Sequence, residues 1–101
     1  MSRADIFAEI EAERARQDAK WGEQNHPSTM TAVGVASAIR DGARRECNSA
    51  ARSGRLTWQH IADEEFWEAI AEPAPAAQRT ELVQLAAVVV AWIECIDRRA
   101  P

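Results

Sequence analysis

A run of twelve residues near the C-terminus, Leu82–Ile93, limits the folds open to this chain more than any other segment. Every residue in the run is apolar except Gln84. A helix that is apolar on all sides is buried on all sides in a water-soluble protein, and twelve residues are too few to cross a bilayer. In a chain of only 101 residues, such burial predicts that a second subunit covers the far face of this helix.

The rest of the chain carries the marks of further helices. Pro73 and Pro75 separate the apolar helix from the one before it, because proline cannot continue a helix. Ser2 and Thr57 are suitable N-caps, and Gly54 is a suitable C-cap for the second helix. The valines of the C-terminal run lie inside a helical pattern, so no strand is expected. The sequence predicts a single all-α, four-helix bundle-like domain, 1–101, with helices at about 3–20, 31–53, 58–72 and 75–99.

Two pairs of oxygen-bearing side chains flank the proline turn. Glu65 and Glu68 precede the turn, and Glu81 and Gln84 follow it. The members of each pair are three residues apart, so they share one helix face. At 1.5 Å of rise per residue, Glu68 and Glu81 both lie about 6–10 Å from the turn. In an antiparallel helix pair these side chains would form a cage of oxygen atoms, which suits a hard divalent cation.

The angular positions in the third helix agree with such a cage. Its apolar face is expected to be centred on Trp58, Ala62, Phe66 and Ala69. Glu65 falls on the edge of this face, where a carboxylate is costly unless something neutralises it, whereas Glu64 is expected to point toward solvent or a neighbouring subunit. A second acidic pair, Glu94 and Asp97, lies roughly 30 Å from the turn and is interpreted as surface charge.

The acidic segment resembles the two-part motif of the MazG-like branch of the all-α NTP pyrophosphohydrolases. The family pattern is Glu-Glu-x-x-Glu, a short gap and then Glu-x-x-Asp. Here the corresponding residues are Glu64-Glu65-x-x-Glu68 and Glu81-x-x-Gln84. Taken with the N-terminal segment described below, the resemblance covers most of the chain, and it implies a MazG-type fold.

The resemblance also implies an activity: Mg²⁺-dependent hydrolysis of nucleoside or deoxynucleoside triphosphates to the monophosphate and pyrophosphate, in nucleotide-pool house-cleaning, with Mn²⁺ able to replace Mg²⁺. It implies that Glu65, Glu68 and Glu81 are metal ligands and that Glu64 orients or deprotonates the attacking water. Gln84 stands where the family has aspartate. Its carbonyl oxygen can still ligate a metal but brings no charge; alternatively, Gln84 hydrogen-bonds a buried backbone group.

The loop that follows the first helix, residues 21–27, gathers glycine, asparagine and proline. The segment Arg16-Gln17-x-x-Lys20-Trp21-Gly22 resembles the N-terminal part of short MazG-like proteins. From this resemblance and the composition of the loop, Lys20 is expected to meet a phosphate, Trp21 to stack on a base and Gln17 to contact a base edge. The alternative is that Trp21 fills the end of the bundle.

Basic residues are concentrated in and just after the second helix, at Arg40, Arg44, Arg45, Arg52 and Arg55. These arginines either hold phosphates or pair with the many glutamates, and pairing is the commoner fate of surface arginines. The net charge of −4 gives no case for general nucleic-acid binding.

The cysteines and the N-terminus bear on the location of the protein. Cys47 and Cys95 lack the spacing of metal ligands and are interpreted as reduced thiols of a cytosolic protein. The N-terminus has no apolar run typical of a signal peptide. A cytoplasmic protein with no membrane partner is therefore expected, and His60 is given no role.

Three functions fit these patterns. The preferred one is a pyrophosphohydrolase that acts on nucleoside triphosphates as a homodimer or a dimer of dimers. The second is a non-catalytic helical oligomer that binds nucleotide or metal as a sensor or interaction module. The third is a structural bundle whose glutamates form a solvated face.

Overall fold

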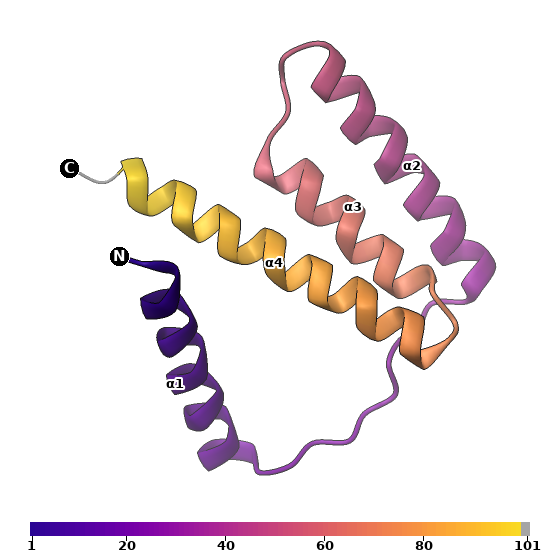
Figure 1. Cartoon of the computed structure of the whole chain (residues 1–101). Helices are drawn as coiled ribbons and strands as arrows, with labels where there is room; N and C mark the ends of the chain where they lie inside the picture. The colour runs from indigo at the N-terminus through magenta and orange to yellow at the C-terminus, as the bar shows by residue number, and fades with distance from the viewer. Residues whose placement is uncertain (100–101) are drawn as a thin grey trace. The chain divides into compact units, whose positions relative to one another are not determined.

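The computed structural model describes residues 1–99, which form four α-helices and no strand (Figure 1). The helices are α1 (Arg3–Trp21), α2 (Val33–Arg52), α3 (Trp58–Ala71) and α4 (Pro75–Arg99). The predicted all-α class is confirmed, and every predicted helix boundary lies within two residues of the observed one. None of the helices in this described range has both the length and the apolar character needed to cross a membrane.

The chain divides into two compact units. One unit comprises Met1–Pro27 together with the chain from Val90 onward, and the other comprises Ser28–Val89. Helix α4 begins in the second unit and ends in the first. All the acidic motif residues belong to the second unit, whereas the predicted nucleotide-contacting residues of α1 belong to the first. The single domain expected from the sequence stays a prediction.

Both predicted N-caps close a capping box. The Ser2 hydroxyl oxygen accepts from the Asp5 N–H at 3.2 Å, and Asp5 Oδ2 accepts from the Ser2 N–H at 2.9 Å. At α3, the Thr57 hydroxyl oxygen accepts from the His60 N–H at 3.2 Å, while His60 Nδ1 accepts from the Thr57 N–H at 3.1 Å. His60, which was given no role, therefore completes the α3 capping box in the place usually taken by glutamate.

A glycine ends α2 and turns the chain toward α3. Gly54 has φ +71°, a backbone conformation that side chains other than glycine rarely adopt. The Arg55 N–H donates to the Ala50 carbonyl at 2.8 Å, and the Gly54 N–H donates to the Ala51 carbonyl at 3.4 Å. These two bonds form a Schellman motif that satisfies the last carbonyls of the helix.

Helices α2 and α3 pack against each other as an antiparallel pair (Figure 1). The fully buried residues of this pair are small: Ala36 and Ala50 on α2, and Ala69 on α3. Phe66, placed by the sequence at the centre of the α3 apolar face, is 43% exposed. That part of the prediction is wrong because α3 packs through small residues on the side that also carries Glu65.

Part of the apolar run in α4 is open to solvent in the single chain. Leu82 is 48% exposed, Val83 56% and Val89 41%, whereas Val90 is buried. The apolar run is therefore not buried on every side within one chain, and its complete burial stays a prediction that needs another subunit. The second subunit expected to cover this face stays a prediction.

The two glycines of the α2 region give a test of this local structure. We expect Gly54→Ala to lower the free energy of unfolding by about 1 kcal/mol, because alanine is strained at positive φ. Gly42 lies inside α2, and a Cβ there would meet only Arg45 Nη2 at an ordinary 3.7 Å. Gly42→Ala should therefore raise the free energy of unfolding by roughly 0.5–1 kcal/mol. Urea unfolding followed by circular dichroism measures both; equal effects of the two variants would contradict the assigned α2 terminus.

Candidate functional site

Three carboxylates meet where α3 turns into α4. Glu65 and Glu68 project from α3 and Glu81 from α4, and one oxygen of each lies within 4.8 Å of the others. The turn that brings them together is fastened by Gln78, whose Nε2 donates to the Ala69 carbonyl at 3.0 Å. The structure thus gathers the three acids that the spacing placed at similar distances from the turn. We call Glu65, Glu68 and Glu81 the carboxylate cluster.

The carboxylate cluster contains polar atoms with no partner. All three residues are half-buried. Glu65 Oε2 and Glu81 Oε2 are buried and have no hydrogen bond within the described part of the chain. Most buried polar atoms in folded proteins are hydrogen-bonded, and an unsatisfied one is costly. The cluster therefore has the capacity to accept a cation or hydrogen-bond donors that residues 1–99 do not supply.

The electrostatics of the cluster follow from burial and crowding. Burial raises the pKa of Glu65, and the charges of Glu68, Glu81 and Glu64 raise it further. Burial also raises the pKa of Glu81, as do the charge of Glu68 and a hydrogen bond with it. Burial disfavours the charged form of a carboxyl group, and neighbouring negative charges act in the same direction. A cation bound at the cluster would instead lower the pKa values of Glu65 and Glu81, because it favours their charged forms.

One arginine from α2 contacts this acidic region. Arg44 Nη2 lies 3.0 Å from Glu68 Oε1, and Arg44 Nε lies 3.8 Å from Glu64 Oε1. Sequence reasoning grouped Arg44 with the other arginines and missed this contact. Arg44 lies three residues before the half-buried Cys47, so it is at the edge of the α2 side that faces α3. That spacing could have distinguished Arg44 from the other arginines as the one near α3.

Glu64 faces α2, where the sequence placed it toward solvent or another subunit. Its side chain is only 21% exposed. Burial, together with a hydrogen bond to Glu64, raises the pKa of the Cys47 thiol to about 11. The expected orientation is wrong because α2 covers the side of α3 that carries Glu64. Its role toward an attacking water stays a prediction.

Gln84 follows Glu81 by one helical turn. Its side chain is exposed and makes no hydrogen bond within residues 1–99. The alternative that Gln84 bonds a buried backbone group is therefore wrong for this chain. An exposed amide beside Glu81 is available for an external ligand, and its role as a metal ligand stays a prediction.

The residues predicted to contact nucleotide lie together at the end of α1. Gln17 Oε1 accepts from Arg14 Nη1 at 2.7 Å. Lys20 Nζ lies 4.4 Å from the centroid of the Trp21 ring, in a cation–π contact. Trp21 is 58% exposed, so the alternative that it fills the end of the bundle is wrong. Because these residues belong to the other compact unit, the structure does not place them at the carboxylate cluster.

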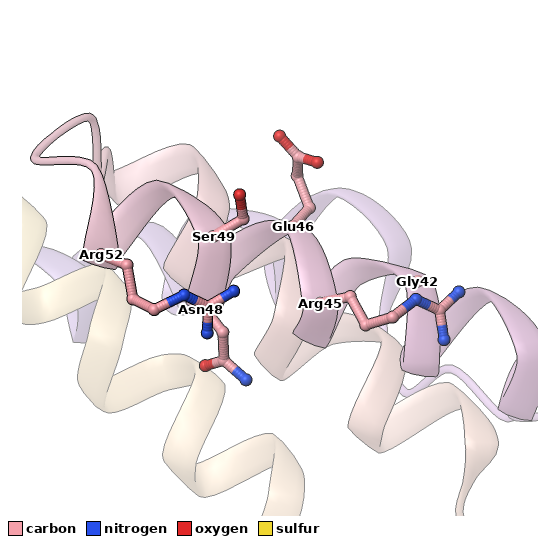
Figure 2. A pocket seen from close by; sticks show the side chains of 6 residues that line it. All are labelled: Gly42, Arg45, Glu46, Asn48, Ser49 and Arg52. Atoms are coloured by element: carbon pink, nitrogen blue, oxygen red, sulfur yellow. The ribbon is translucent and has the colours of Figure 1, made fainter.

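The remaining arginines divide between pairing and exposure. Arg40 pairs with Asp41 at 3.0 Å. Arg45 and Arg52 have no ion pair among the residues described, and they border a shallow hollow on the outer side of α2 (Figure 2). The hollow is lined by Gly42, Arg45, Glu46, Asn48, Ser49 and Arg52. Some of these arginines therefore pair with carboxylates, and others remain available to anions, as the two alternatives allowed.

The second acidic pair is not simple surface charge. Glu94 is 22% exposed and pairs with Arg3 at 3.3 Å. Asp97 Oδ2 is buried without a hydrogen-bond partner in residues 1–99. The interpretation as surface charge is wrong because the end of α4 lies inside the unit that contains α1. The pair belongs to a different unit from the carboxylate cluster.

Comparisons with known proteins found no relative of this chain. No protein-family model, no curated protein and no solved structure matches it. The resemblance to the MazG-like pyrophosphohydrolases therefore rests on the motifs of the sequence itself.

The raised pKa values predict how stability depends on pH. The folded state holds the protons of Glu65 and Glu81 more tightly than the unfolded chain does. In metal-free buffer we therefore expect their contribution to the free energy of unfolding to fall as the pH rises from about 4.3, the ordinary glutamate value, through the raised values. Glu65→Gln should flatten this fall. Urea unfolding at a series of pH values with a chelator measures it.

Asp63→Asn is the matched control, since Asp63 is an exposed acid on the same helix. It should leave the pH dependence of the wild type unchanged. A Glu65→Gln protein with the same pH dependence as the wild type would show that the carboxylate cluster is not under electrostatic strain.

Proposed function

We propose that this chain is a divalent-metal-dependent pyrophosphohydrolase that converts nucleoside or deoxynucleoside triphosphates to the monophosphate and pyrophosphate. The observation that carries the proposal is the convergence of Glu65, Glu68 and Glu81, with two buried oxygens that lack partners. The link from a metal-binding cluster to this reaction is the resemblance of the acidic motif to that of the MazG-like enzymes.

The donor set fits Mg²⁺ or Mn²⁺. Both are hard cations that prefer carboxylate oxygens. In a Mg²⁺ octahedron with bonds of about 2.1 Å, adjacent ligand oxygens are about 3.0 Å apart and opposite ones about 4.2 Å. The cluster oxygens lie within 4.8 Å of one another, so side-chain movements of the order of an ångström would bring them to bonding distance. In this proposal Gln84 adds a neutral oxygen one turn beyond Glu81.

The chemistry of phosphoryl and nucleotidyl transfer suits such a site. When bound, the metal supplies neutralisation of phosphate charge and alignment of the scissile bond. The chain's own contribution is to hold the ligands on two helices joined by a short turn. Glu64, adjacent to the ligand Glu65, would orient an attacking water or accept its proton.

The same proposal gives roles to the rest of the chain. Lys20 would contact a phosphate, after moving from its present contact with Trp21. Trp21 would stack on the base, and Gln17 would contact the base edge. The exposed apolar residues of α4 would be covered by another copy of the chain in a homodimer or a dimer of dimers. Exposed Leu82 and Val83 lie beside Gln84, so this contact would also shield the edge of the metal site.

A panel of canonical and modified nucleoside triphosphates, assayed for pyrophosphate release with Mg²⁺, tests the activity. We expect Glu68→Gln and Glu81→Gln to lower the rate roughly 100-fold or more, because each removes a charged ligand in a site that works by charge neutralisation. Asp63→Asn is the control and should keep wild-type activity. Mg²⁺-dependent stabilisation without any pyrophosphate release would favour the non-catalytic sensor. A wild-type protein with neither Mg²⁺-dependent stabilisation nor pyrophosphate release would favour the structural bundle.

Gln84→Asp measures what the departure from the family motif costs. A fourth carboxylate should strengthen Mn²⁺ binding, because an amide oxygen brings no charge to the site. We expect the dissociation constant for Mn²⁺, measured by electron paramagnetic resonance, to fall roughly tenfold. Ala76→Glu, which adds one negative charge at an exposed position near the start of α4, controls for a general electrostatic effect. An unchanged Mn²⁺ affinity in Gln84→Asp would remove residue 84 from the ligand set.

A further inference from the structure

A single arginine forms ion pairs with the carboxylate cluster and its neighbour Glu64 in the described structure. Four glutamates, at positions 64, 65, 68 and 81, lie close enough to influence one another's charge. Arg44 is the only basic side chain within residues 1–99 that forms an ion pair with any of them. It reaches across from α2 to Glu68 and Glu64, while Glu65 and Glu81 have no ion pair in the described structure.

Arg44 and a divalent cation would compete for the same carboxylate. Arg44 Nη2 hydrogen-bonds Glu68 Oε1 at 3.0 Å, and Glu68 also supplies an oxygen to the cluster. Two cations close to one carboxylate repel each other, so the arrival of one weakens the hold of the other. Arg44 is also the more exposed partner: its side chain is 48% exposed, against 20% for Glu68. It can therefore leave without opening the packed α2–α3 interface.

We infer that Arg44 is an exchangeable counter-ion. It holds Glu68 and Glu64 while the cluster lacks a divalent cation, and it turns to a phosphate of the bound triphosphate once the cation neutralises the carboxylates. A guanidinium group suits both partners, because its planar donors match carboxylate and phosphate oxygens alike. The inference rests on the proposed function for the triphosphate, and on the geometry of Arg44 for the exchange.

The first measurement is Mn²⁺ affinity without nucleotide, by electron paramagnetic resonance at about pH 8, well above the ordinary pKa of glutamate. Arg44→Met removes the competing charge and keeps much of the side-chain volume. Its dissociation constant for Mn²⁺ should fall roughly fivefold relative to the wild type. Arg44→Lys keeps the charge and should stay close to the wild type. Arg40→Met and Arg45→Met are matched controls on α2 that leave the Glu64 and Glu68 contacts intact, and they should leave the affinity unchanged.

The second measurement is the affinity of the Mn²⁺-loaded protein for a triphosphate with a non-hydrolysable α,β bridge. Here Arg44→Met should act in the opposite direction and weaken binding roughly tenfold, because it removes a charge-assisted contact to phosphate. Arg44→Lys should lose less, since an ammonium group keeps the charge but not the planar fork. An exchange predicts that Arg44→Met strengthens Mn²⁺ binding and weakens triphosphate binding. If Arg44 were merely structural, its loss would weaken both.

The outcomes separate this inference from the proposed function. If the wild type binds Mn²⁺ and releases pyrophosphate, but Arg44→Met changes neither affinity or weakens both, the exchange is overturned and the activity stands. If the wild type binds no Mn²⁺, the proposed function and the exchange fall together. Should Arg44→Met lose its helical circular dichroism, Arg44→Gln replaces it in the same comparison, with the same expected directions.

Discussion

An excess of negative charge is held where α3 turns into α4, beside α2, and it constrains the rest of this region. Glu65 and Glu81 each keep a buried oxygen without a partner, and burial and mutual repulsion raise their pKa values. Folding tolerates this cost because the turn is secured elsewhere, by Gln78 on the Ala69 carbonyl. A site that costs stability when empty gains most from the ligand that neutralises it.

Helix α2 completes this acidic region from the other side. Its small residues let α3 approach closely, and that approach brings Arg44 and Cys47 to Glu64 and Glu68. The arginine offsets part of the charge without filling the cluster, because it reaches one carboxylate of the three. A partly neutralised cluster can fold without metal, and the proposed metal-dependent function requires this property.

Local chemistry made the helices predictable. Ser2 and Thr57 cap α1 and α3, and Gly54 ends α2. Pro73 lies between α3 and α4, and Pro75 begins α4. Each of these residues acts through neighbours a few residues away. The convergence of the three glutamates was predictable for a similar reason. Their heights depend only on helical rise and on a short turn, so residue spacing sets the distance between them.

The sequence alone therefore determined the all-α class, the helix boundaries and the meeting of Glu65, Glu68 and Glu81. Only the tertiary structure decided that Glu64 turns toward α2, that Arg44 is the arginine reaching the acids, and that much of the α4 apolar face stays open in one chain. The physical reason is that the rotation of a helix about its own axis is set by packing. Close contact between alanines selects the side of α3 that packs on α2, and a small change in this rotation turns neighbouring positions inward or outward.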